Sequence, residues 1–179
     1  MIARVKSHLR RFRKSQSGAA ITLEFMVLLP LFLYVFFFGI ELSIHSIRQL
    51  QLDRGVEVTV REIRLNTNQQ FTHASIKDAI CVNTGGIEDC NANLKLEMVP
   101  TNPRTFRGMA PSNDCYDTSF PVVPQRGWSL GREHDVMLLR ACYAFKPVFA
   151  NIGLGERLPK DSRGFARLTS VTAFVQEPR

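Results

Sequence analysis

The sequence predicts an α+β protein in which a long N-terminal transmembrane helix continues outside the membrane and carries a small, disulfide-stapled antiparallel β domain. Three observations predict this fold class. An apolar run of about 22 residues begins at Ala19. Segments with alternating apolar and polar residues follow later in the chain. All four cysteines come after the apolar run, as is typical of an exported domain.

The apolar run is long enough to cross a membrane as a helix. It extends from Ala19 to Ile40 and is interrupted by Thr22, Glu24 and Tyr34. At 1.5 Å per residue, such a helix is ~33 Å long, and a bilayer core is roughly 30 Å thick. A helix satisfies every backbone N–H and C=O within the segment, which lipid requires. The run therefore predicts a single membrane span.

Glu24 is the residue of this span that packing in lipid does not explain. It lies five residues inside the apolar run. A carboxylate at mid-bilayer costs on the order of 2.5–3.5 kcal/mol, and somewhat less near an interface. A residue kept at such a cost is a hypothesis for a functional site, and here we expect its partner charge to come from another molecule.

The positive charge is concentrated in the N-terminal tail. Six of the 23 basic residues precede any acid, which leaves 17 basic and 16 acidic residues in the rest of the chain. The later residues therefore provide little support for a nucleic-acid partner. Basic residues beside a membrane helix stay in the cytoplasm. We therefore expect an inner (cytoplasmic) membrane protein with a cytoplasmic N-terminus and a periplasmic C-terminal domain.

The chain divides into four predicted parts. Residues 1–18 form a basic cytoplasmic leader or tail, 19–40 the transmembrane helix, 41–66 its continuation outside the membrane, and 67–179 a periplasmic α+β domain. The continuation rests on apolar residues at three- and four-residue spacing, namely Ile40, Ile44, Ile47, Leu52, Val56, Val60 and Ile63. The alternative is a membrane anchor followed by a separate short helix.

The periplasmic domain should contain one helix and three strands. Thr72 can cap a helix that reaches towards Val82 and is broken by Asn83-Thr-Gly-Gly. Alternation predicts strands at Leu94–Val99 and Asp135–Lys146. A weaker strand pattern covers Phe165–Val175. The segments between Pro100 and Gly131 and between Gly153 and Gly164 are expected to be loops.

The four cysteines predict two disulfides. Their spacings contain no CxxC, and no HExxH is present, so the sequence argues against a zinc site. Three pairings are open. Pairing of sequence neighbours is favoured, which joins Cys81 to Cys90 and Cys115 to Cys142.

The sequence contains no pattern typical of an enzyme or of a cofactor site. His8, His45, His73 and His134 are scattered, and Gly85-Gly86 does not begin a phosphate-binding loop. Trp128, the single tryptophan, is interpreted as a packing residue in preference to a ligand platform. We therefore expect no catalytic residues, no metal and no cofactor.

The residues around the start of the apolar run resemble a known family. A basic leader followed by SGAAITLEF resembles the N-terminus of type IV prepilins and, more specifically, of TadE/TadF-like proteins of the tight-adherence (Flp) pilus system. The later run QLDRGVEVTVREIRL, Gln51 to Leu65, resembles the segment that follows the membrane helix in the same family. Further similarity lies in the four-cysteine domain, in PKD at Pro159–Asp161 and in the closing TAFVQEP.

The resemblance implies a processing region at Gly18, Ala19, Ala20 and Glu24, cut by a prepilin peptidase. The family usually has four residues between its glycine and glutamate, whereas here there are five. Cleavage after Gly18 and cleavage after Ala19 are both open. The implied fold is pilin-like, and the implied partners are other pilin-like subunits and the pilus assembly machinery.

Two functions follow as expectations. The first is a minor pilin-like (pseudopilin) membrane protein that takes part in assembly of Flp/Tad adhesion pili. The alternative is a single-pass envelope protein, unrelated to filaments, whose periplasmic domain binds a partner. Glu24 and the small residues before it favour the first.

Overall fold

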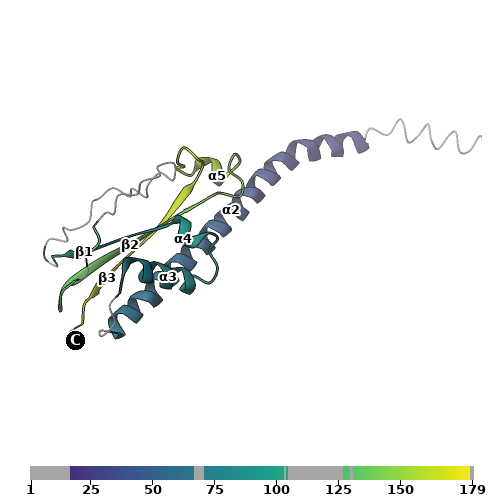
Figure 1. Cartoon of the computed structure of the whole chain (residues 1–179). Helices are drawn as coiled ribbons and strands as arrows, with labels where there is room; N and C mark the ends of the chain where they lie inside the picture. The colour runs from purple at the N-terminus through teal and green to yellow at the C-terminus, as the bar shows by residue number, and fades with distance from the viewer. Residues whose placement is uncertain (1–16, 67–70, 103, 105–126, 130, 178–179) are drawn as a thin grey trace, which may run out of the picture.

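A computed structural model of the chain describes residues 17–66, 71–102, 104, 127–129 and 131–177. Its largest element is helix α2, Ser17–Leu65, a single helix of 49 residues. The N-terminal half of α2 stands away from the rest of the molecule, whereas its C-terminal half packs against a small domain (Figure 1). The predicted continuation of the apolar helix is therefore confirmed, and the alternative of two separate helices is wrong.

The packed half of α2 buries one face. Leu52, Val56, Val60 and Ile63 follow one another at three- and four-residue intervals and are at most 7 % exposed. This spacing places the four side chains on one stripe of a helix. The stripe faces the sheet and the second helix, where it forms one wall of the core.

Three antiparallel strands form a sheet in the order β1-β2-β3. The strands are β1 Leu94–Thr101, β2 Val136–Phe145 and β3 Ala166–Val175, so all three predicted strands are confirmed. The central strand pairs Tyr143 with Leu94 of β1 and with Leu168 of β3. Alternate residues of β2 are buried on the face towards the helices. They are Met137, Leu139, Ala141, Tyr143 and Phe145.

Helix α3, His73–Asn83, begins at the predicted cap. Thr72 Oγ1 accepts a hydrogen bond from the Ser75 N–H at 3.1 Å, and Ser75 Oγ accepts one from the Thr72 N–H at 2.8 Å. This reciprocal capping box satisfies two donors that the helix itself cannot use. Ile76 and Ile80 then point into the core.

The last turn of α3 packs on α2 at Gly55. A Cβ on Gly55 would lie 2.6 Å from Thr84 Cγ2 and 2.9 Å from the Ile80 carbonyl oxygen. The missing side chain therefore permits the close approach of the two helices. Gly55 does not end α2, as expected from its modest helix penalty of ~1 kcal/mol.

Two one-turn helices were not predicted. Helix α4, Cys90–Asn93, precedes β1. Helix α5, Leu154–Arg157, lies in the segment predicted as a loop between Gly153 and Gly164, and that prediction was wrong for these residues. A single turn contains too few residues to show helical periodicity.

Trp128 contributes to packing. It forms an isolated β-bridge with Met98 of β1 and packs against the core. Its ring also lies edge to face with the His73 ring, with 4.7 Å between the ring centroids. The predicted packing role of Trp128 is therefore supported. Most of the loop expected between Pro100 and Gly131, including Cys115, lies outside the described residues.

Candidate functional site

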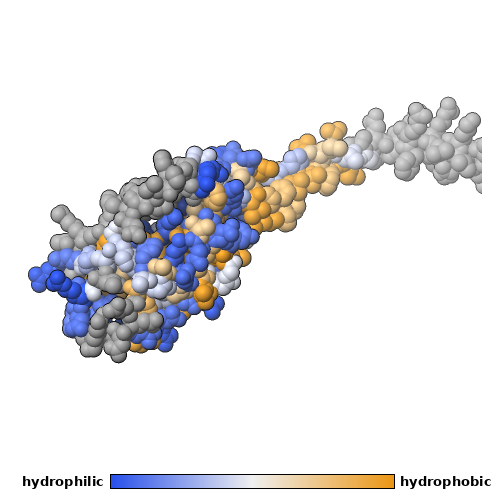
Figure 2. Space-filling model, in the orientation of Figure 1, coloured by the Kyte–Doolittle hydropathy of each residue, from blue (hydrophilic) through white to orange (hydrophobic). Residues whose placement is uncertain are grey.

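The free half of α2 presents an almost wholly apolar surface. Between Ile21 and Phe36, the large hydrophobic side chains that are exposed have exposed fractions of 38–75 %. Figure 2 shows this apolar helix emerging from a body with a mixed, largely polar surface. Among the described residues, α2 is the one helix long and apolar enough to cross a membrane. These features fit a single-pass membrane protein.

Glu24 lies on this apolar surface and is itself exposed. No hydrogen bond or ion pair involves its carboxylate within the part of the chain that the structure describes. The sequence has no Lys, Arg or His between Lys14 and His45. A partner three or four residues away on the same helix is therefore excluded.

The predicted processing region lies in the first turns of α2. Gly18 is exposed, and its carbonyl oxygen accepts a hydrogen bond from Thr22 Oγ1 at 2.8 Å. Ala19 and Ala20 are also helical, and their side chains lie outside the described residues. Thr22, the other polar residue near Glu24, thus directs its hydroxyl to the backbone of its own helix. Processing at this region stays a prediction.

A second carboxylate of α2 has a very different environment. Glu41, the first residue after the apolar run, is 0 % exposed. Its Oε1 accepts a hydrogen bond from the Val148 N–H at 3.2 Å, and its Oε2 accepts one from the Phe149 N–H at 2.9 Å. The two oxygens therefore hold consecutive backbone amides of the segment that follows β2. Such charge-assisted bonds are stronger than bonds between neutral groups.

The segment held by Glu41 lies against the end of the apolar run. We call residues 147–158 the collar. The Phe149 ring lies 5.0 Å from the Phe37 ring, centroid to centroid. A Cβ on Gly153, which has φ +64°, would lie 3.4 Å from Phe38 Cα. In Figure 1, α5 lies beside α2 where the helix leaves the domain. The collar thus joins the apolar helix to the sheet.

The lysine that follows the collar holds its other end. Lys160 Nζ donates hydrogen bonds to the carbonyl oxygens of Ala150 at 2.6 Å and Gly155 at 2.9 Å. Arg48 of α2 donates to the Lys146 carbonyl oxygen at 3.2 Å and covers the Phe145 ring at 5.0 Å. Both sides of the collar are therefore fixed by charged groups.

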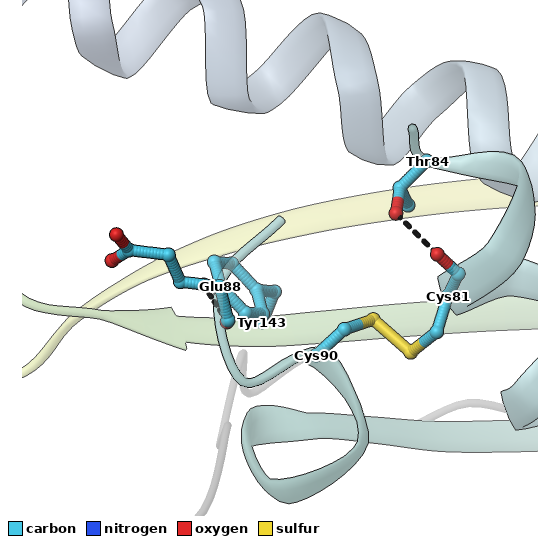
Figure 3. Close-up of a disulfide and its surroundings, with 5 residues drawn as sticks. All are labelled: Cys81, Thr84, Glu88, Cys90 and Tyr143. Carbon is cyan, nitrogen blue, oxygen red and sulfur yellow. Dashed lines mark hydrogen bonds between the residues drawn. A yellow bond between two sulfur atoms is a disulfide. The ribbon is translucent and has the colours of Figure 1, made fainter. Parts of the chain in front are cut away.

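The predicted disulfide between Cys81 and Cys90 is present (Figure 3). It joins α3 to α4. The loop inside it is held by the Tyr143 hydroxyl, which donates to the Glu88 carbonyl oxygen at 2.7 Å. Burial raises the pKa of the Tyr143 hydroxyl above its ordinary value, so Tyr143 stays a neutral donor. Cys142 is also in a disulfide, and its predicted partner Cys115 lies outside the described residues.

The histidines do not come together in the described structure. His45 lies beside Phe145 and His73 beside Trp128, His134 stands in a turn before β2, and His8 is outside the described residues. Among the residues that the structure describes, no three His, Cys, Asp or Glu side chains are placed to hold a metal ion.

A groove of about 390 Å³ lies between α2 and β3. Arg64 and Glu177 line this groove and form an ion pair, with 3.4 Å between Arg64 Nη2 and Glu177 Oε1.

The sequence predicts a functional role for Glu24, which stays a prediction, and gives no indication of the role of Glu41. The sequence shows Glu41 as an acid at the end of an apolar run, which is ordinary for a membrane boundary. Its two donors lie 107 and 108 residues later in the chain. No local pattern connects such distant positions.

Comparisons with protein-family models, with curated proteins and with solved structures find no match.

Proposed function

We propose that this chain is a minor pilin-like membrane protein that takes part in assembly of Flp/Tad adhesion pili. The observation that carries the proposal is Glu24, an exposed carboxylate in an apolar helix, with no partner among the described residues. A helix gains nothing from a lone carboxylate in lipid, so a partner should exist in the working state. That partner then comes from another molecule.

Removal of the leader would create a suitable partner. Cleavage after Gly18 leaves an α-amine on Ala19, five residues before Glu24, and cleavage after Ala19 leaves one on Ala20, four residues before it. A neighbouring subunit displaced along the helix axis could then bring its Glu24 to that amine. The resemblance of SGAAITLEF to prepilin N-termini supports this arrangement. In the proposed setting, the helix lies in the inner membrane, the basic tail is cytoplasmic and the domain is periplasmic.

The test is the variant Glu24→Ala in cells that carry the other pilin-like subunits. Breaking a charge pair in a low-dielectric environment by removing one partner costs roughly 3–5 kcal/mol. The association constant should therefore fall at least about 100-fold. We expect membrane insertion to persist while co-purification with pilin-like subunits and the number of surface pili decline. Glu24→Asp, with a shorter reach, should give an intermediate result.

Thr22→Val is the matched control. It replaces another polar residue of the same run, and its hydroxyl bonds to the helix backbone at Gly18. This variant should assemble as the parent chain does. Normal assembly by Glu24→Ala would show that the carboxylate is incidental, and would leave the helix as a plain anchor for a partner-binding envelope domain.

A further inference from the structure

The collar lies at the depth of the last apolar turn of α2. Phe37, whose ring contacts Phe149 at 5.0 Å, precedes Glu41 by four residues, or ~6 Å along the helix axis. Gly153 lies against the backbone of Phe38. A bilayer that covers the whole apolar run would therefore reach the collar as well.

The collar exposes apolar side chains at this level. Val148 is 54 % exposed and Ile152 is 48 % exposed. They flank Phe149, which is half-buried against Phe37. Together these residues extend the apolar surface of the membrane helix onto the folded domain. Exposed aliphatic residues that continue a membrane-facing surface are typical of segments in the lipid interface.

Charged side chains of the protein also pair with four backbone groups of the collar. Glu41 accepts hydrogen bonds from the N–H groups of Val148 and Phe149, and Lys160 donates to the carbonyl groups of Ala150 and Gly155. Non-helical backbone at membrane depth is tolerated where its polar groups have protein partners. Glu41 and Lys160 thus reduce the number of collar backbone groups that need a hydrogen bond from water.

We propose that the collar is a membrane-docking surface. Its partner is the lipid interface next to the membrane span, and Val148 and Ile152 insert between the headgroups and the acyl chains. This proposal rests on the membrane crossing that the proposed function includes, and it does not require a filament. The docked collar fixes the orientation of the domain on the membrane, and Glu41 acts as the positioning residue that holds the collar at this depth.

Tryptophan substitution tests the proposal in the full-length protein. The parent chain has one tryptophan, Trp128, so its signal can be subtracted. Ile152→Trp is reconstituted in phosphatidylcholine vesicles in which part of the lipid carries bromine high on the acyl chain. An interfacial side chain lies ~5–10 Å into the headgroup and acyl boundary, so we expect about half of the added fluorescence to be quenched.

Two control variants make the result decisive. Val175→Trp replaces a residue of similar exposure, 45 %, at the end of β3 that lies near Arg64, close to the far end of α2. Its fluorescence should not be quenched. Phe36→Trp, in the apolar run, should be quenched strongly.

Equal quenching of Ile152→Trp and Val175→Trp, with Phe36→Trp quenched, would overturn the docking surface and leave the membrane span intact. Loss of quenching at Phe36→Trp as well would overturn the membrane crossing, and with it the docking surface and the proposed function. Failure of pilus assembly leaves all three fluorescence results unchanged. The two proposals can therefore fail separately.

Discussion

Replacing Glu41 with alanine removes the acceptor of two backbone hydrogen bonds and should loosen the collar from α2. The carboxylate is fully buried and is bonded to the N–H groups of Val148 and Phe149 at 3.2 and 2.9 Å. A buried donor left without a partner costs about 1–3 kcal/mol. Val148 and Phe149 are not fully buried, so water can replace part of this loss. We expect Glu41→Ala to destabilise the collar by about 2–4 kcal/mol.

Amide hydrogen exchange on the full-length protein in micelles measures this effect where it occurs. A loss of 2–4 kcal/mol should speed exchange at Val148 and Phe149 by roughly 30- to 700-fold, while amides of β2 change much less. Glu41→Gln keeps one carbonyl acceptor but turns an amide group towards the second donor. We expect about half of the free-energy loss, ~1–2 kcal/mol, for that variant.

Glu62→Gln provides the matched control, because Glu62 is an exposed carboxylate later on the same helix. It should leave exchange in the collar unchanged, in keeping with a surface substitution worth less than ~0.5 kcal/mol. If Glu41→Ala also leaves the exchange of Val148 and Phe149 unchanged, the carboxylate does not hold the collar, and its burial would need another explanation.

Two further predictions concern the folded domain. Gly55→Ala should destabilise the protein by about 1–3 kcal/mol in urea unfolding, because its Cβ would meet the Ile80 carbonyl oxygen. The control Gly39→Ala, on the same helix with no atom within 4 Å of the added Cβ, should be neutral or slightly stabilising. A larger loss of stability for Gly39→Ala than for Gly55→Ala would refute the close-packing argument. Mass spectrometry of non-reduced peptides from cells should find Cys81 joined to Cys90 and Cys115 to Cys142, and reduction of the first pair should cost up to ~2.7 kcal/mol. Free thiols would contradict both the pairing and the proposed periplasmic location.

The elements that sequence reasoning identified are those with many periodic residues. The buried apolar residues of α2 recur over several turns from Leu52 to Ile63, and buried apolar residues recur at every second position of β2. Both segments are long enough for the period of their apolar residues to identify a helix and a strand. Thr72 was identifiable because a capping residue acts on its immediate neighbours. Pairing of neighbouring cysteines gave Cys81 and Cys90 for a similar reason, since a short loop is easily closed.

The features that sequence reasoning missed depend on long-range contacts or on very few residues. The burial of Glu41 follows from amides that β2 and the turn after it bring to α2. The need for glycine at position 55 follows from where α3 ends. Helix α5 has a single turn, so its residues carry no periodic pattern. In each case the deciding partner is far away in the sequence or the signal is too short to detect.

Glu24 lies inside the apolar run and Glu41 directly follows it, and together they separate two roles that a carboxylate on a membrane helix can have. They are 17 residues apart in the sequence, or ~25 Å along the helix. Glu41 finds two donors within its own chain, so its contribution is complete in a single subunit and should appear as stability. Glu24 has no such donor in the described part of the chain, so we infer that its contribution requires a second subunit and should appear in assembly. A variant of Glu41 should therefore alter the isolated protein, whereas a variant of Glu24 should alter only its association with others.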